Sequence, residues 1–151
     1  MARDVEGPAA VAEVVPRLAG ELGGIDRFIA NAGTGESASV GTGHAARNRA
    51  VPGTNVLGTH ASCGAAMELC GAQGAGHLVV ISSVASVRGM TGSRSAYGAG
   101  KAAPSSLAES IRADVLGGPI PVTTVLPGFI ATDINTGRRG PSSVRVVRRL
   151  T

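Results

Sequence analysis

The sequence predicts an α/β fold in which an open parallel sheet is covered by helices in three layers. Amphipathic helical segments alternate along the chain with short runs of β-branched residues. With two phenylalanines and no tryptophan, the core must be built from Val, Ile, Leu and Ala, which suits a parallel sheet buried by helices. A chain of 151 residues that is 43% hydrophobic has the size of one domain. We therefore expect a single sheet.

Apolar residues at helical spacing predict helices over residues 8–22, 55–70 and 96–116. Pro8 is placed in the first turn of the first helix, Gly23 follows its end, and Pro16 is expected to kink it. The glycines at 71–76 and 117–118 are expected to end the other two helices. The predicted core faces are Val11, Val14, Val15, Leu18 and Leu22, then Val56, Thr59, His60, Cys63, Met67 and Cys70, and finally Leu107, Ile111 and Val115.

Short β-branched or apolar runs predict strands over residues 25–30, 77–81 and 121–126. The second run is continuously apolar and too short for a helix, which indicates a central strand. The intervening segment 34–54 is rich in Gly, Ala, Ser and Thr, so we expect a loop with at most one short helix. Asn31, Ser83 and Pro127 follow the three strands, and ligand sites of parallel sheets gather at these carboxyl ends.

The charge and cysteine patterns narrow the function classes. The net charge of +4 is concentrated in an arginine-rich tail, residues 138–151, which we expect to be disordered. With no interleaved aromatic residues, this tail argues against nucleic-acid binding. Cys63 and Cys70 lack metal-ligand spacing, so we expect buried free thiols and no metal site. No apolar run has the length of a membrane span or a secretory signal, so we expect no membrane contact and a cytoplasmic location.

The stretch 95–101 carries the only tyrosine and the only lysine of the chain, Tyr97 and Lys101, four residues apart. On a helix this spacing places both side chains on one face. A neighbouring ammonium favours phenolate over phenol, and a positioned phenolate can take a proton from an alcohol or return one to a carbonyl. The pair is a candidate acid/base unit. The alternative is a structural tyrosine beside a surface lysine.

Five motifs in register resemble the short-chain dehydrogenase/reductase family. They are Asn31-Ala32-Gly33, Asn55, Ile81-Ser82-Ser83, the pair Tyr97 and Lys101, and Pro127-Gly128-Phe129-Ile130-Ala131-Thr132. Asp4 is a further match, to an aspartate that contacts adenine in the family. The resemblance covers residues 4–134 and implies a partial Rossmann-type domain over residues 1–137. It also implies hydride transfer between NAD or NADP and a small carbonyl or alcohol substrate.

The resemblance also implies roles for individual residues. Tyr97 would exchange a proton with the substrate oxygen, Lys101 would favour its phenolate form and hold the ribose, and Ser83 would donate a hydrogen bond to the carbonyl. Asn55 would hold a water linked to Lys101. The implied cofactor-binding residues are Asp4, Asn31, Ala32, Gly33, Tyr97, Lys101, Pro127, Gly128, Ile130 and Thr132. The structural alternatives are a helix N-cap for Ser83 or for Asn55 and a plain turn at Pro127-Gly128.

The sequence departs from the family pattern at both ends. Nothing matches the glycine-rich turn that holds the pyrophosphate, and the arginine-rich tail stands where the family has its substrate-covering segment. We therefore expect a truncated or frame-disrupted coding sequence, and the choice between NAD and NADP stays open. The alternative function is a non-catalytic remnant that associates with related subunits. Helices 55–70 and 96–116 are the expected surfaces for this association or for a homo-oligomer.

Overall fold

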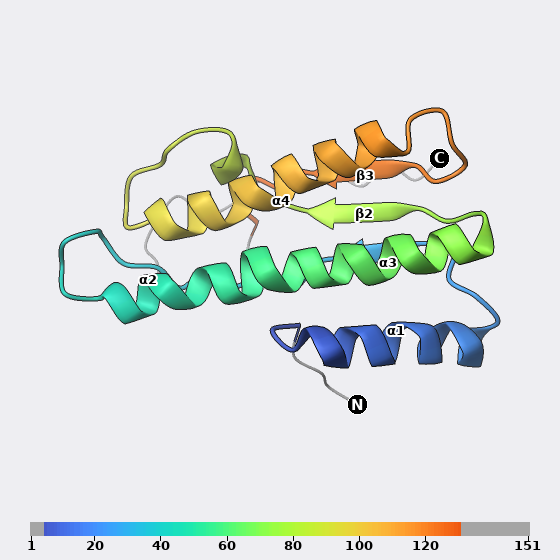
Figure 1. Cartoon of the computed structure of the whole chain (residues 1–151). Helices are drawn as coiled ribbons and strands as arrows, with labels where there is room; N and C mark the ends of the chain where they lie inside the picture. The colour runs from blue at the N-terminus through green and yellow to red at the C-terminus, as the bar shows by residue number, and fades with distance from the viewer. Residues whose placement is uncertain (1–4, 131–151) are drawn as a thin grey trace.

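A three-stranded parallel sheet lies behind a row of helices in the computed structural model, which describes residues 5–130 (Figure 1). The strands are β1 (Phe28–Ala30), β2 (Leu78–Ile81) and β3 (Val122–Val125). The helices are α1 (Pro8–Leu22), α2 (Ala45–Pro52), α3 (Thr59–Gln73) and α4 (Ser95–Asp114), with a π-helical turn η1 (Gly53–Gly58) and a 3-10 turn η2 (Val84–Ser86). The predicted α/β class is confirmed. The predicted tail at 138–151 lies outside the described residues.

The sheet has the order β1-β2-β3, and β2 is the central strand as predicted. Phe28, Leu78 and Val122 lie at the same level across the three parallel strands. β1 begins later than the predicted residue 25, because Ile25 pairs instead with the Gln73 side chain at the end of α3. β1 therefore lies at an edge of the described sheet, where its outer backbone groups have no strand partner among residues 5–130.

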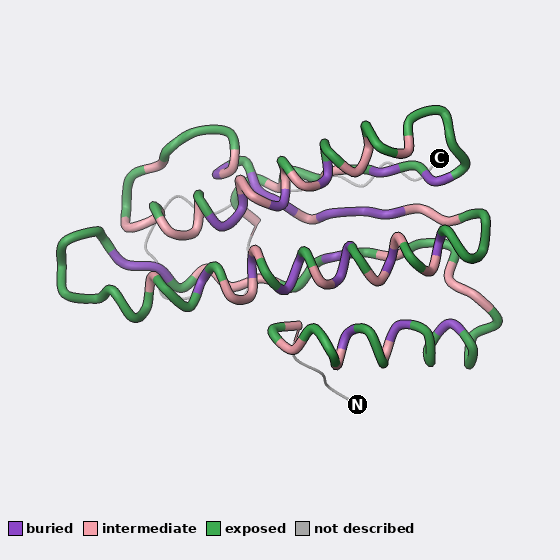
Figure 2. The backbone as a smooth tube through the Cα atoms, viewed as in Figure 1, coloured by how far each residue is buried: buried purple, intermediate pink, exposed green. Residues whose placement is uncertain are grey.

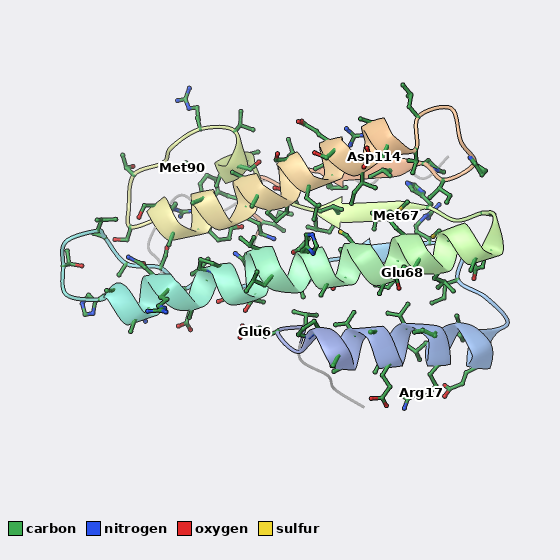
Figure 3. All side chains as sticks on the ribbon, viewed as in Figure 1. Glu6, Arg17, Met67, Glu68, Met90 and Asp114 are labelled. Carbon is green, nitrogen blue, oxygen red and sulfur yellow. The ribbon has the colours of Figure 1, made fainter. Side chains whose placement is uncertain are left out.

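The core lies between this sheet and the inner faces of α3 and α4. Figure 2 shows β2 buried along most of its length, with burial alternating along the helices. Leu78 and Val80 are fully buried and pack with Cys63, Ala66 and Ala108 from the helices. Leu107, Ile111 and Val115 pack against this cluster, so the predicted core face of α4 is confirmed. Met67 lies over β2 in the same way (Figure 3).

The opposite face of the sheet is more open in the described residues. Ile29 and Val125 point to that face, because they alternate with the core residues Ala30 and Val122, and they are 55% and 38% exposed. The helices of residues 5–130 lie on the other face (Figure 1). The described residues thus form two of the three expected layers.

The first helix is confirmed at its predicted bounds, but its predicted core face is wrong in part. Val11, Val15 and Ala19 are buried, whereas Leu18 is 39% and Leu22 is 72% exposed. The reason is that α1 packs chiefly beside α3 rather than on the sheet, so only a narrow stripe is covered (Figure 1). Glu6, just before α1 (Figure 3), accepts a hydrogen bond from the hydroxyl of Thr54 in η1. This bond links the start of α1 to η1.

The predicted helix 55–70 is part of a longer helical run, so its predicted start and end are both wrong. α2, η1 and α3 follow one another from Ala45 to Gln73, and the run ends where Gly74 adopts the left-handed conformation. Pro52 and Gly53 do not break it, because both residues keep right-handed helical backbone angles where α2 passes into the π-helical turn. His60 is exposed rather than part of the buried stripe. Small residues fill that stripe, which lets α3 approach its neighbours closely.

Both cysteines are buried free thiols, as predicted. The buried Cys63 thiol should make the free energy of unfolding depend on pH. Burial raises the pKa of the Cys63 thiol from 9.0 to about 11. Between these values the unfolded chain releases the proton and the folded chain keeps it, so the free energy of unfolding falls as pH rises. One unit of pKa corresponds to about 1.4 kcal/mol. We expect about 1 kcal/mol to be lost from this thiol between pH 8 and pH 10.

Urea unfolding of the wild type and of Cys63→Ala at both pH values measures this effect. The variant will be less stable at pH 8 because it lacks a buried sulfur, but its stability should fall less on going to pH 10. Burial lowers the pKa of Lys101, which acts in the opposite direction by raising stability as pH approaches 10.5, and it does so equally in both proteins. Equal pH slopes for the two proteins would contradict the prediction.

Candidate functional site

A pocket of about 440 Å³ opens at the carboxyl ends of the three strands. Five segments line it: the loop after β1, the end of β2 with η2, the loop between η2 and α4, the first turns of α4, and the loop after β3. Its lining residues are Asn31, Gly33, Gly35, Ile81, Ser82, Ser83, Val84, Ala85, Met90, Arg94, Tyr97, Lys101, Pro127, Gly128, Phe129 and Ile130. The sequence-based expectation that reactive groups gather at these strand ends is therefore met by the geometry.

The first turns of α4 bring Tyr97 and Lys101 to this pocket. Glycine inside a helix costs about 1 kcal/mol relative to alanine, yet two glycines stand between the pair. A Cβ at Gly98 would lie 3.1 Å from the Ala85 carbonyl oxygen, and one at Gly100 would lie 3.0 Å from Val51 Cγ1. The glycines thus let α4 seat closely against η2 and α2, which fixes the position of Tyr97 and Lys101 at the pocket wall.

Lys101 is buried, with 4% of its surface exposed, and both ends of the residue bond to the end of β2. Its Nζ donates a hydrogen bond of 2.9 Å to the Ile81 carbonyl, and its own carbonyl accepts one of 2.7 Å from the Ser82 hydroxyl. Burial disfavours the ammonium form and lowers the pKa of Lys101. The interpretation as a surface lysine is therefore wrong. The side chain is held in a fixed orientation in the site.

Asn55 is fully buried in η1, and its amide holds the loop that follows β1. Its Oδ1 accepts a hydrogen bond of 2.8 Å from the Thr34 N–H, and its Nδ2 donates one of 3.0 Å to the Thr34 carbonyl. The alternative of a helix N-cap is wrong, because Asn55 lies inside a helical run. Asn55 does not line the pocket directly. It positions the neighbouring Gly33, which does.

Ser83 combines a capping role with access to the pocket. Its Oγ accepts a hydrogen bond of 3.1 Å from the Ala85 N–H, so the N-cap interpretation is confirmed for the 3-10 turn η2. This bond uses an acceptor lone pair and leaves the hydroxyl proton available, and within residues 5–130 that proton has no acceptor. A pocket-lining hydroxyl that can still donate suits the polarisation of a substrate carbonyl.

A chain of serine hydroxyls, which the sequence interpretation missed, lies behind the pocket. The Ser105 hydroxyl is 2.8 Å from that of Ser82 and 3.1 Å from that of Ser86. Ser82 in turn donates to the Lys101 carbonyl. These bonds join α4 to η2 and to the residue after β2, next to the buried Pro104, which can donate no backbone hydrogen bond. The helix continues through Pro104.

Most of the predicted site residues come together in the pocket. Its wall includes Asn31, Gly33, Ser83, Tyr97, Lys101, Pro127, Gly128 and Ile130. Ala32 and Asn55 are outside the lining, and Asp4 and Thr132 lie outside the described residues. The interpretation of Pro127-Gly128 as a plain turn is incomplete, because the Pro127 carbonyl accepts a hydrogen bond of 3.0 Å from the Val84 N–H. This bond fixes the loop after β3 against η2.

Gly33 offers a direct test of how tightly the Lys101 ammonium is held. A Cβ at Gly33 would lie 3.0 Å from Lys101 Nζ and 3.3 Å from Asn55 Oδ1. Because Nζ is anchored to Ile81, we expect Gly33→Ala to displace the ammonium and to cost about 1 to 3 kcal/mol of stability. The chain has one lysine, so ¹³C-lysine labelling gives a single Cε signal by NMR, which should shift in the variant.

The matched control for this experiment is Gly64→Ala on the exposed side of α3, where an added Cβ meets nothing within 4 Å. It should leave the Cε signal in place and stabilise the helix slightly. An unshifted signal in Gly33→Ala would show that the contact can relax without moving the ammonium.

Two features of residues 5–130 bear on other function classes. No group of three or more His, Cys, Asp or Glu residues is placed to hold a metal ion in this part of the chain. Among the helices described there, none combines the length and the apolarity needed to cross a membrane.

Comparisons with known proteins agree with this geometry. The profile of the short chain dehydrogenase family matches residues 1–141. An uncharacterized oxidoreductase of Mycobacterium tuberculosis is 41% identical over 131 residues, which are 87% of this chain and 52% of the relative. An uncharacterized oxidoreductase of Myxococcus xanthus is 36% identical over 138 residues, or 91% of this chain and 54% of the relative. The chain thus spans about half the length of the curated relatives it matches.

The fold also matches solved structures. A gluconate 5-dehydrogenase from Burkholderia cenocepacia, solved in complex with NADP and tartrate, superposes with a TM-score of 0.82 at 25% identity, covering 89% of this chain and 52% of that one.

Proposed function

This chain belongs to the short-chain dehydrogenase/reductase family, and from that premise we propose that it is an oxidoreductase that transfers a hydride between NAD or NADP and a carbonyl or alcohol. The observation that carries the proposal is the single pocket wall shared by Ser83, Tyr97 and Lys101 at the carboxyl ends of the strands. Since the chain matches about half of each relative, the activity of the whole protein is part of the proposal.

The residues of the pocket fit the nicotinamide end of such a cofactor. The absence of a side chain at Gly33 leaves space beside the Lys101 ammonium, which a Cβ would approach to 3.0 Å. Asn31 and Gly33 form one wall, and Pro127, Gly128 and Ile130 form another. We propose that Lys101 contacts the ribose and that the loop after β3 contacts the carboxamide, while Asp4 and Thr132 keep their sequence-based assignments to the adenine and the carboxamide. When bound, the nicotinamide group supplies or accepts the hydride.

The residues of the chain then handle the proton and the orientation of the substrate. Ser83 donates a hydrogen bond from its hydroxyl to the substrate oxygen and so holds the carbonyl in place. Tyr97 gives a proton to that oxygen during reduction or takes one from the alcohol during oxidation. The Lys101 ammonium contributes a positive charge at the same pocket wall. Asn55 keeps the loop after β1 in place, and its implied water contact with Lys101 is part of the proposal.

The test is nucleotide binding followed by turnover. The fluorescence of NADH and of NADPH should change saturably on titration with the purified chain, and the tighter nucleotide identifies the cofactor. Oxidation of that nucleotide in the presence of small ketones and aldehydes then measures activity. A folded protein that changes the fluorescence of neither nucleotide would overturn the proposal for this chain.

We also propose that copies of the chain, or related subunits, associate through the helical surface of residues 55–70 and 96–116. In support, Leu57 at the start of this surface is 68% exposed, so an apolar side chain is available there for a partner. Leu57→Lys should shift the species seen by analytical ultracentrifugation toward monomer, and an active wild-type monomer would exclude this association. The non-catalytic alternative predicts association without nucleotide binding.

The cytoplasmic location stays a prediction from the sequence.

A further inference from the structure

Arg94 introduces a positive charge into the pocket that the proposed chemistry does not use. It immediately precedes α4 and lies three residues before Tyr97. None of the described residues that line the pocket is an acid. Of the two cationic side chains there, the Lys101 ammonium already donates to the Ile81 carbonyl. Within residues 5–130, no hydrogen bond or ion pair involves the Arg94 guanidinium, so its N–H donors can bind a ligand.

The guanidinium is held in place by its stacking on Phe129. Its central carbon lies 4.7 Å from the centre of the Phe129 ring, within the range of a cation–π interaction. Stacking uses the face of the guanidinium and leaves its hydrogen-bonding edge for another group. Phe129 also lines the pocket, so this contact places the guanidinium at the pocket wall.

The backbone before Arg94 is held in a conformation that non-glycine residues rarely adopt. Ser93 has a φ of 60°, and among residues 5–130 it is the one residue other than glycine with a positive φ. Its carbonyl accepts a hydrogen bond from the Ser37 hydroxyl, and its own hydroxyl lies 2.7 Å from that of Ser39. Such strain persists where surrounding bonds enforce it, often at ligand sites. Here these bonds fix the direction in which the chain enters α4 at Arg94.

The shape of the surface leaves room for a substrate that extends past Tyr97. A second hollow of about 550 Å³ adjoins the first, and the two share Met90, Arg94 and Phe129. Figure 3 shows Met90 on the loop that leads to the start of α4. A molecule whose carbonyl lies at Tyr97 would therefore reach Arg94 with a group further along its chain.

We propose that Arg94 binds a carboxylate on the substrate, so that this site acts on a carbonyl or alcohol compound that also carries a carboxylate. This inference rests on the proposed function, since it names the substrate class of the same site. A carboxylate accepts two parallel hydrogen bonds from the edge of a guanidinium, and the planar fork of Arg94 matches it. The pocket's positive charge adds attraction, which salt should weaken.

Binding of matched probes in the absence of nucleotide tests this inference. Acetoacetate, 4-oxopentanoate and 5-oxohexanoate vary the distance between carbonyl and carboxylate, and their methyl esters remove the charge alone. The chain has one tyrosine and no tryptophan, so its fluorescence reports Tyr97 in the pocket. We expect at least one keto acid to bind about tenfold or more tightly than its ester, and Arg94→Gln to abolish that preference.

Two further variants separate charge from packing and from general surface charge. Arg94→Lys keeps the positive charge and should retain part of the preference for the acid. Arg88→Gln removes an exposed charge from the same loop outside the pocket and should leave binding unchanged. Equal binding of acid and ester to the wild type, no saturable acid binding, or an unaltered preference in Arg94→Gln would overturn the inference. Turnover restricted to uncharged ketones would also overturn the inference, but it would leave the proposed function intact. Binding of a keto acid without turnover would count against the proposed function and would leave the inference standing.

Discussion

Replacing Tyr97 with phenylalanine is expected to lower turnover about a thousandfold, within the range that general acid–base groups contribute. The change removes one oxygen and keeps the aromatic ring, so the first turn of α4 should still seat against η2 through Gly98. Ser83 can still orient a carbonyl, but no other residue of the described pocket lining carries a phenol that could exchange the proton. The loss should therefore appear in kcat, with little change in the affinity for the nucleotide.

The measurement compares kcat with the affinity for NADH or NADPH, read from the fluorescence of the nucleotide itself. Ser95→Ala is the control, because Ser95 is exposed on the same first turn and outside the pocket lining. It should alter turnover by less than about twofold, as expected for a surface change. If Tyr97→Phe retained most of the wild-type turnover, the proton would have to come from another donor, and the role proposed for Tyr97 would be wrong.

The sequence was sufficient to predict the residues of the site that depend on local spacing. Tyr97 and Lys101 lie on one helix, where the helical period alone places them together, and Ser83 follows an apolar run that could only be a strand. Arg94 was missed because its contribution depends on where α4 begins and on the stacking with Phe129. The hydrogen bond between Ser82 and Ser105 was missed because it joins residues 23 apart in the sequence. Such contacts are set by packing, which periodicity does not describe.

The same distinction explains the errors in the fold. The period of α1 predicts a stripe that includes Leu18 and Leu22, but the neighbour of the helix decides how much of the stripe is covered. The prediction of a loop with at most one short helix before residue 55 followed from the Gly, Ala, Ser and Thr content of residues 34–54. In the structure a π-helical turn keeps α2 and α3 in one run. The tertiary contacts of Val51 and Asn55, both fully buried, outweigh that local preference.

Substituting alanine for Gly76 is expected to destabilise the chain by about 3 to 5 kcal/mol, which is a large part of the stability of a typical domain. Gly76 lies in the turn between α3 and β2, with a φ of 151°. A Cβ there would lie 2.3 Å from Cys70 Sγ and 3.0 Å from Cys70 Cβ, and Cys70 is 1% exposed. The sulfur has no room to retreat, so the turn or the helix must shift. Urea unfolding of the purified variant measures the loss.

Two further variants separate the backbone cost from the steric cost. Gly74 also has a positive φ, of 69°, but an added Cβ meets nothing within 4 Å, so Gly74→Ala should cost only about 1 to 2 kcal/mol. Cys70→Ala combined with Gly76→Ala removes the clashing sulfur, and the double variant should be more stable than the sum of the single changes predicts. Strict additivity would place the cost of Gly76→Ala in the backbone conformation alone. A coupling of about 1 kcal/mol or more would show that β2, the strand carrying Ile81 and Ser83 to the pocket, is held in place by the close packing of Gly76 on Cys70.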